Sequence, residues 1–137
     1  MKHSTVLKTI LFLSGLIVTG IGGVILLTPV AYFASNGIDL GGNITLLNEV
    51  RAPGGALLAS GLLIVTGVFV PKLTFTSAVI ATLVYLSYGI SRMLSIAIDG
   101  MPADALVTAT IVEIVIGLVA LFAVVTYRNS ERQKMTS

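Results

Sequence analysis

The chain has 137 residues, a mean hydropathy of +1.03 and 10% charged side chains, and its net charge is +2. Soluble domains carry about 25% charged residues, so this composition excludes a soluble protein and indicates an integral membrane protein. The basic residues mostly flank apolar segments, so their small excess does not indicate nucleic-acid binding. The length fits one domain over residues 1–137. The absence of cysteine excludes disulfides and thiolate chemistry.

Four apolar segments are long enough to cross a bilayer as helices, which takes about 20 residues each. In chain order they are residues 6–27, 53–70, 73–93 with 98 as the alternative end, and 103–127. Backbone groups in lipid must be hydrogen-bonded within the segment, and none of the four alternates like a barrel strand. The sequence therefore predicts an all-α, four-helix transmembrane bundle.

The connections between these segments predict the topology. Residues 29–35, PVAYFAS, either lie at the membrane interface or form a plain loop. The turn at residues 70–74, VPKLT, is so short that the helices on either side must be antiparallel. Basic residues lie at one end of the predicted bundle, which places both termini in the cytoplasm and the protein in a bacterial inner membrane as a multi-pass protein; they are Lys2, Lys8, Lys72, Arg128, Arg132 and Lys134.

Small residues in the first two segments indicate close helix packing, since they let backbones approach each other in a membrane. Gly15, Thr19 and Gly23 recur every four residues in the first segment. In the second segment the small residues are Gly54, Gly55, Ala56, Ala59, Ser60 and Gly61. We interpret both sets as packing surfaces first and as room for a ligand second.

The third segment carries a stripe that changes from small to aromatic to charged. Steps of three and four residues place its members on one helix face, which we expect to point inward; they are Ala78, Ala81, Tyr85, Tyr88, Arg92, Ser95 and Asp99. Glu113 lies about 15 Å along the fourth segment, near mid-membrane. A carboxylate at that depth is costly, so we predict that Glu113 is protonated or strongly hydrogen-bonded.

Together these positions define one candidate ligand site at the outer end of the bundle. Its predicted residues are Glu49, Arg51, Tyr85, Tyr88, Arg92, Ser95, Asp99 and Glu113. The alternative interpretation is an ion-pair network that only sets helix register, because structural networks have the same composition. No catalytic residue, metal ligand or cofactor is predicted.

Two stretches, NEVRAPGGALLASG at 48–61 and SRMLSIAIDGMP at 91–102, together with Glu113, resemble an uncharacterised family of short bacterial four-helix membrane proteins with a domain of unknown function. The motifs that carry the resemblance are NExRAxGG and SRxxSxxxDGxP. The layout is distantly similar to that of DoxX-like membrane proteins. The resemblance implies an inner-membrane bundle and brings no activity with it; the positions that match the pattern are Glu49, Arg51, Gly54, Gly55, Arg92, Ser95, Asp99, Gly100, Pro102 and Glu113.

The sequence favours non-catalytic binding of an amphipathic ligand, a lipid or a quinone-like molecule, in a polar pocket near the outer leaflet. An accessory subunit that contacts a second copy or another membrane protein is the main alternative. Proton-linked transport through Glu113 and a membrane-embedded enzyme rank lower. An enzyme is disfavoured because the sequence has no recognisable nucleophile motif or metal-ligand spacing.

Overall fold

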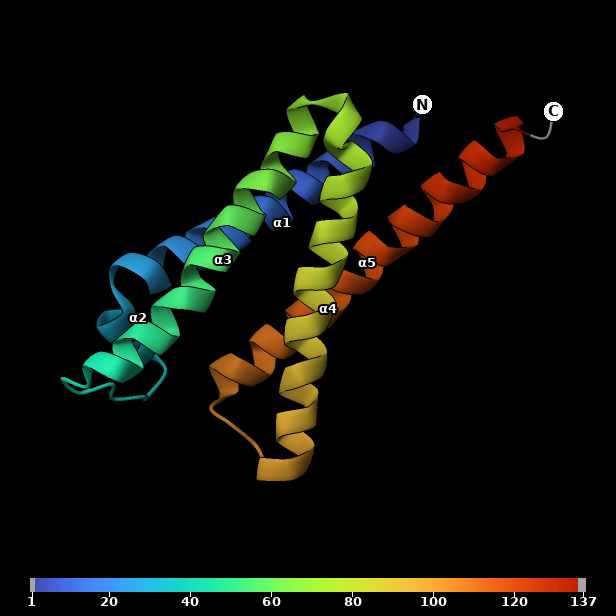
Figure 1. Ribbon diagram of the computed structural model, residues 1–137. Helices are drawn as coiled ribbons and strands as arrows, with labels where there is room; N and C mark the ends of the chain where they lie inside the picture. The colour runs from blue at the N-terminus through green and yellow to red at the C-terminus, as the bar shows by residue number, and fades with distance from the viewer. Residues whose placement is uncertain (1, 136–137) are drawn as a thin grey trace.

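The computed structural model describes the backbone of residues 2–135 and the side chains of residues 5–129. Within this range the chain is helical and has no strand (Figure 1). The elements are α1 (Lys2–Leu27), α2 (Pro29–Ser35), α3 (Ile44–Phe69), the 3-10 turn η1 (Pro71–Leu73), α4 (Thr74–Asp99) and α5 (Asp104–Met135).

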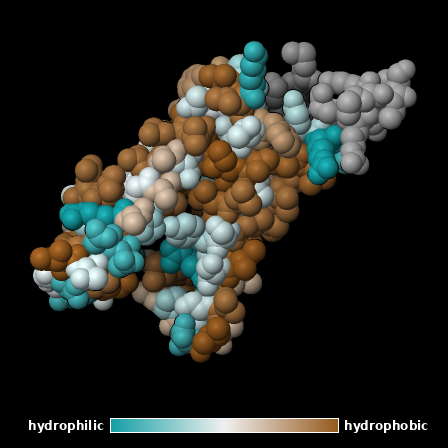
Figure 2. Space-filling model, in the orientation of Figure 1, coloured by the Kyte–Doolittle hydropathy of each residue, from teal (hydrophilic) through white to brown (hydrophobic). Residues whose placement is uncertain are grey.

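Four of these helices, α1, α3, α4 and α5, are long and apolar enough to cross a membrane. The 26 residues of α3 extend about 39 Å at 1.5 Å per residue, which exceeds a hydrocarbon core of about 30 Å. Most of the face of the bundle that Figure 2 shows is hydrophobic. The predicted all-α fold with four apolar helices is therefore confirmed.

The helix α3 extends beyond the predicted second span, because it begins at Ile44 rather than at residue 53. Asn43 caps it, and its side chain accepts a hydrogen bond from the Leu46 backbone N–H at 3.1 Å. Pro53 lies inside the helix, where its missing N–H removes only the bond to the carbonyl of Glu49. The segment with Glu49 and Arg51 is thus part of a helix and not of the connection.

Two other boundaries also differ from the expectation. Residues 29–35 form the short helix α2, with Pro29 at its first position, which suits a helix start. The last helix continues to Met135, past the predicted end at residue 127. The third span agrees with the longer alternative, since α4 ends at Asp99, where Gly100 adopts a φ of 98° that other residues rarely take.

The four long helices run up and down, so both termini lie at one end of the bundle, which we call the terminal end (Figure 1). The opposite end, with α2 and residues 100–103, is the loop end. The helix α1 packs along α3, and α4 crosses α5 (Figure 1). Two hydroxyls join α4 to α3 near η1, since Thr74 donates to the Gly67 carbonyl and Ser77 donates to the Leu63 carbonyl, both at 2.8 Å.

Glycines set the close contact between α1 and α3. A Cβ on Gly22 would overlap the Leu58 backbone nitrogen, and one on Gly61 would overlap Thr19. Gly54 likewise faces Ile25, whose Cγ2 would lie 2.7 Å from an added Cβ. Gly23, which the four-residue spacing included, has open space beside it. The contact face of α1 therefore follows Gly15, Thr19 and Gly22.

At the terminal end, one core cluster joins all four long helices. Its buried members are Leu11, Ile64, Ala78, Ala81 and Ala120. A second cluster lies nearer the loop end and includes Val18, Ile25, Leu57 and Tyr85. Beyond this second cluster, α1 and α3 lie apart from α4 and α5, and this separation makes room for the site.

Candidate functional site

A cavity of about 470 Å³, the main cavity, lies toward the loop end between α1 and α2 on one side and α4 and α5 on the other. Pockets for small molecules span about 300–1,000 Å³ and are mostly apolar with a few polar groups, which describes this one. Figure 2 shows a hollow with hydrophilic surface inside it, between the α2–α3 region and α4. The polar lining residues are Tyr32, Ser35, Asn36, Tyr85, Tyr88, Arg92, Thr108 and Glu113.

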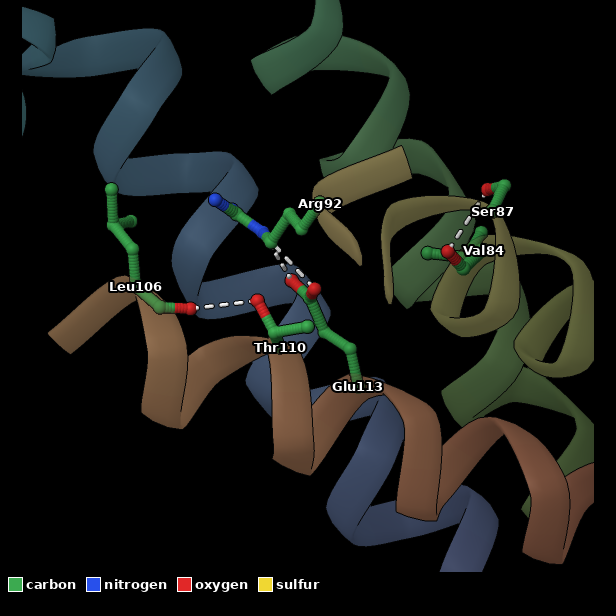
Figure 3. Close-up of polar contacts among 6 residues, drawn as sticks. All are labelled: Val84, Ser87, Arg92, Leu106, Thr110 and Glu113. Atoms are coloured by element: carbon green, nitrogen blue, oxygen red, sulfur yellow. Dashed lines mark hydrogen bonds and ion pairs between the residues drawn. The ribbon is translucent and has the colours of Figure 1, made fainter. Parts of the chain in front are cut away.

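An ion pair between Arg92 of α4 and Glu113 of α5 forms the charged centre of the main cavity. Arg92 Nε donates to both carboxylate oxygens of Glu113, at 3.3 Å to Oε1 and 3.1 Å to Oε2 (Figure 3). Arg92 is 30% exposed and Glu113 is 17% exposed, so the pair is half-buried. The hydrogen bonding predicted for Glu113 is therefore present in the structure.

Because α4 and α5 cross closely, Arg92 and Glu113 lie within hydrogen-bonding distance of each other. A Cβ on Gly89 would lie 2.7 Å from Ile114 Cδ1, and one on Gly117 would lie 2.5 Å from Leu86 Cδ2. Glycine at both positions lets each helix seat a large apolar side chain of its partner. Arg92 lies three residues beyond Gly89 and Glu113 four residues before Gly117, so the pair forms just on the loop-end side of the crossing.

Tyr85 closes the main cavity toward the terminal end. Its ring is 3% exposed, and its hydroxyl donates a hydrogen bond of 2.7 Å to the backbone carbonyl of Ser14 in α1. This bond joins α4 to α1, which otherwise have few contacts. Tyr85 therefore acts as the cavity floor and as a tie between the two sides of the bundle.

We expect Tyr85→Phe to lower the free energy of unfolding by about 1 kcal/mol, because it removes the bond to Ser14 and keeps the ring. Unfolding by sodium dodecyl sulfate in mixed micelles, followed by circular dichroism, measures this. Tyr127→Phe is the control, since the Tyr127 hydroxyl has no hydrogen-bond partner among the described side chains. Equal stability of both variants would contradict the assigned role of Tyr85.

The guanidinium of Arg92 uses only one of its three nitrogens for Glu113. Its far end points away from the carboxylate (Figure 3). Among the described residues, no acceptor lies within hydrogen-bonding distance of its terminal Nη groups. Since these N–H groups are obligate donors and Arg92 lines the cavity, they are available to a ligand.

A second, side cavity of about 190 Å³ adjoins the main one and is bounded by α2, α3 and α4. Val50 and Pro53 of α3 line only the side cavity and not the main one. The two cavities share six residues, which are Ile25, Tyr32, Asn36, Tyr88, Arg92 and Leu106. Arg92 and Tyr88 thus line both cavities, whose lining residues range from α5 to α3.

The structure divides the predicted site residues into two groups. Tyr85, Tyr88, Arg92 and Glu113 line the main cavity together. The other four, Glu49, Arg51, Ser95 and Asp99, are exposed and line neither cavity.

The second group makes local contacts instead. Arg51 Nε donates to the carbonyl of Leu26 at 3.1 Å, at the last turn of α1. Ser95 donates to the Asp99 carboxylate at 3.0 Å within the last turns of α4. Glu49 lies in the first turns of α3. The single predicted rim of charges is therefore dispersed over separate helix ends.

Sequence reasoning missed the contribution of α2. Tyr32, Ser35 and Asn36 form a polar wall of the main cavity, and the Asn36 amide donates to the Tyr32 carbonyl at 3.0 Å. The signal was present, because Ser35 and Asn36 follow Tyr32 by three and four residues, about one helix turn. Placing it at the interface did not reveal that it folds back over the bundle.

In the part of the chain that the structure describes, no three histidine or acidic side chains gather closely enough to hold a metal ion. Glu113 has Arg92 as its partner, and among the described side chains no other carboxylate lines the cavity beside it.

Comparison with known proteins identifies a family and no closer relative of known activity. The family described as a domain of unknown function (DUF4345) matches residues 6–124. No curated protein and no solved structure matches the chain. The match covers α3 and α4 in full, α1 from residue 6, α5 up to residue 124, and the residues that line both cavities.

Proposed function

Because this chain belongs to the DUF4345 family, which carries a domain of unknown function, its role must be argued from the site, and we propose that it binds an amphipathic lipid-like molecule without transforming it. The observation that carries this is a half-buried Arg92 with free Nη donors in a largely apolar cavity of about 470 Å³. The apolar wall suits a hydrocarbon tail, and the donors suit a polar head.

The shape of the site also supports a ligand rather than a merely structural ion pair. A pair that only sets helix register would be expected to direct more of the guanidinium N–H groups at protein acceptors. Here the donors face a hollow bounded by α1, α2, α4 and α5. A polar head of a molecule from the surrounding membrane would satisfy these donors.

We place the protein in the bacterial cytoplasmic membrane with both termini inside. Lys8, Lys72 and Arg128 lie in the first turns of α1, in η1 and in the last part of α5, all at the terminal end. The positive-inside rule puts such an end in the cytoplasm. The cavities then lie toward the outer leaflet.

The test is to purify the protein from its own membranes and identify co-purified lipids by native mass spectrometry. Ala109→Phe fills the main cavity from α5 without altering a charge, and Ile111→Phe adds the same ring on the exposed face of α5. We expect a stoichiometric adduct in the wild type and in Ile111→Phe, and its loss in Ala109→Phe. The mass of the adduct would identify the ligand.

The same spectra distinguish the main alternative. An identical set of adducts in all three proteins, or none in any, would overturn ligand binding in this cavity. A second copy or another protein retained in all three would favour the accessory-subunit role instead.

A further inference from the structure

We infer that the ligand of this site, given the proposed function on which this rests, has an uncharged head with acceptor oxygens, such as an ester or a ketone, and not an anionic one. An arginine in a pocket ordinarily suggests a carboxylate or phosphate. Two properties of this pocket argue against that.

The first property is that the charge of Arg92 is already neutralised. The Glu113 carboxylate lies 3.1 Å from Arg92 Nε, so the cavity as a whole carries no net charge. Every other residue that lines either cavity is uncharged. Arg51 is exposed and donates to the Leu26 carbonyl, outside the lining. A bound anion would therefore add an uncompensated negative charge beside a carboxylate in a region of low dielectric, which is costly.

The second property is that the cavity presents unpaired hydrogen-bond donors. The Nη groups of Arg92 have no acceptor among the described residues, and they lie in the hollow that Tyr32 and Tyr88 also line. The Asn36 amide nitrogen is occupied, because it donates to the Tyr32 carbonyl. Carbonyl oxygens satisfy the Nη donors without adding charge. An uncharged acceptor head matches both the hydrogen bonding and the charge of the site.

Glu113 is then the residue that determines specificity, through its effect on Arg92. Removing its charge leaves Arg92 unpaired and makes the cavity positive. The preference of the site should then change from an uncharged head to an anionic one. A residue that only stabilised the fold would weaken both classes of ligand together.

The experiment compares two lipids that have the same acyl chains and differ in the head. Delipidated protein is mixed with dioleoylglycerol or dioleoylphosphatidic acid, and the bound fraction is measured by native mass spectrometry. We expect the wild type to bind dioleoylglycerol about tenfold more tightly than the phosphatidic acid. Glu113→Gln should reverse this order. Arg92→Gln should weaken the binding of dioleoylglycerol without improving that of the phosphatidic acid, because it leaves Glu113 as an unpaired negative charge in the cavity.

Asp104→Asn is the charge control, since it removes one exposed acid from the first turn of α5 and Asp104 lines neither cavity. It should keep the wild-type ratio. A wild type that prefers the phosphatidic acid in an Arg92-dependent way would overturn the uncharged head and keep the proposed function. Binding of both lipids that is unaffected by Arg92→Gln and Ala109→Phe would instead overturn the proposed function.

Discussion

Gly22→Ala should lower the free energy of unfolding by about 3 kcal/mol, the upper part of the range for an overpacked contact. A Cβ at this position would overlap the Leu58 nitrogen and lie 2.8 Å from the Gly54 oxygen. These are backbone atoms, so no side chain can move aside, and α1 must separate from α3. Thermal or detergent-induced unfolding, followed by circular dichroism, measures the loss.

Gly20→Ala is the matched control, because an added Cβ there meets nothing within 4 Å. It lies on the same helix, two residues earlier, and replaces glycine by a better helix former, so stability should be unchanged or slightly higher. If both substitutions had the same effect, the α1–α3 contact would not be where the structure has it. Comparing the two variants separates the effect of helix propensity on stability from the effect of the α1–α3 packing contact.

Arg92→Gln should lower the free energy of unfolding by about 2 kcal/mol, because it leaves the Glu113 carboxylate half-buried without a partner. Breaking a fully buried ion pair lowers the free energy of unfolding by more than this. The loss is smaller here because Arg92 is 30% exposed. The same unfolding assay as for Gly22→Ala measures this change.

The double variant Arg92→Gln with Glu113→Gln tests whether the two residues stabilise the bundle through their contact with each other. It removes both charges and keeps two side chains that can hydrogen-bond to each other. We expect it to recover at least half of the stability lost in Arg92→Gln. Additive losses in the double variant would show that the two residues stabilise the bundle independently, against the observed bonds of 3.1 and 3.3 Å.

The inward stripe on α4 shows which buried positions helical periodicity alone can predict and which it cannot. Steps of three and four residues correctly aligned Ala78, Ala81 and Tyr85, which are buried, with the half-buried Arg92. The same rule included Ser95 and Asp99, which are exposed. Periodicity defines a face of one helix, but it carries no information on how far the neighbouring helices extend beside it. At the loop end, α4 extends beyond the helices beside it (Figure 1).

The small-residue pattern on α1 shows the same limit. A strict four-residue spacing selected Gly15, Thr19 and Gly23, yet the contact passes through Gly22 and leaves Gly23 open. The two choices differ by about 100° around the helix axis. Which one faces α3 depends on the rotation of both helices, and that rotation is set by contacts between segments about 40 residues apart.

By itself, the sequence determined the membrane class, the four apolar helices, and the presence of Arg92 and Glu113 among inward residues, because these follow from composition and local periodicity. Only the tertiary structure decided that Arg92 pairs with Glu113, that Arg51 bonds to the end of α1, and that α2 closes a cavity. Pairing of charges depends on distance across helices, and distance depends on how the glycine contacts orient each helix against the next.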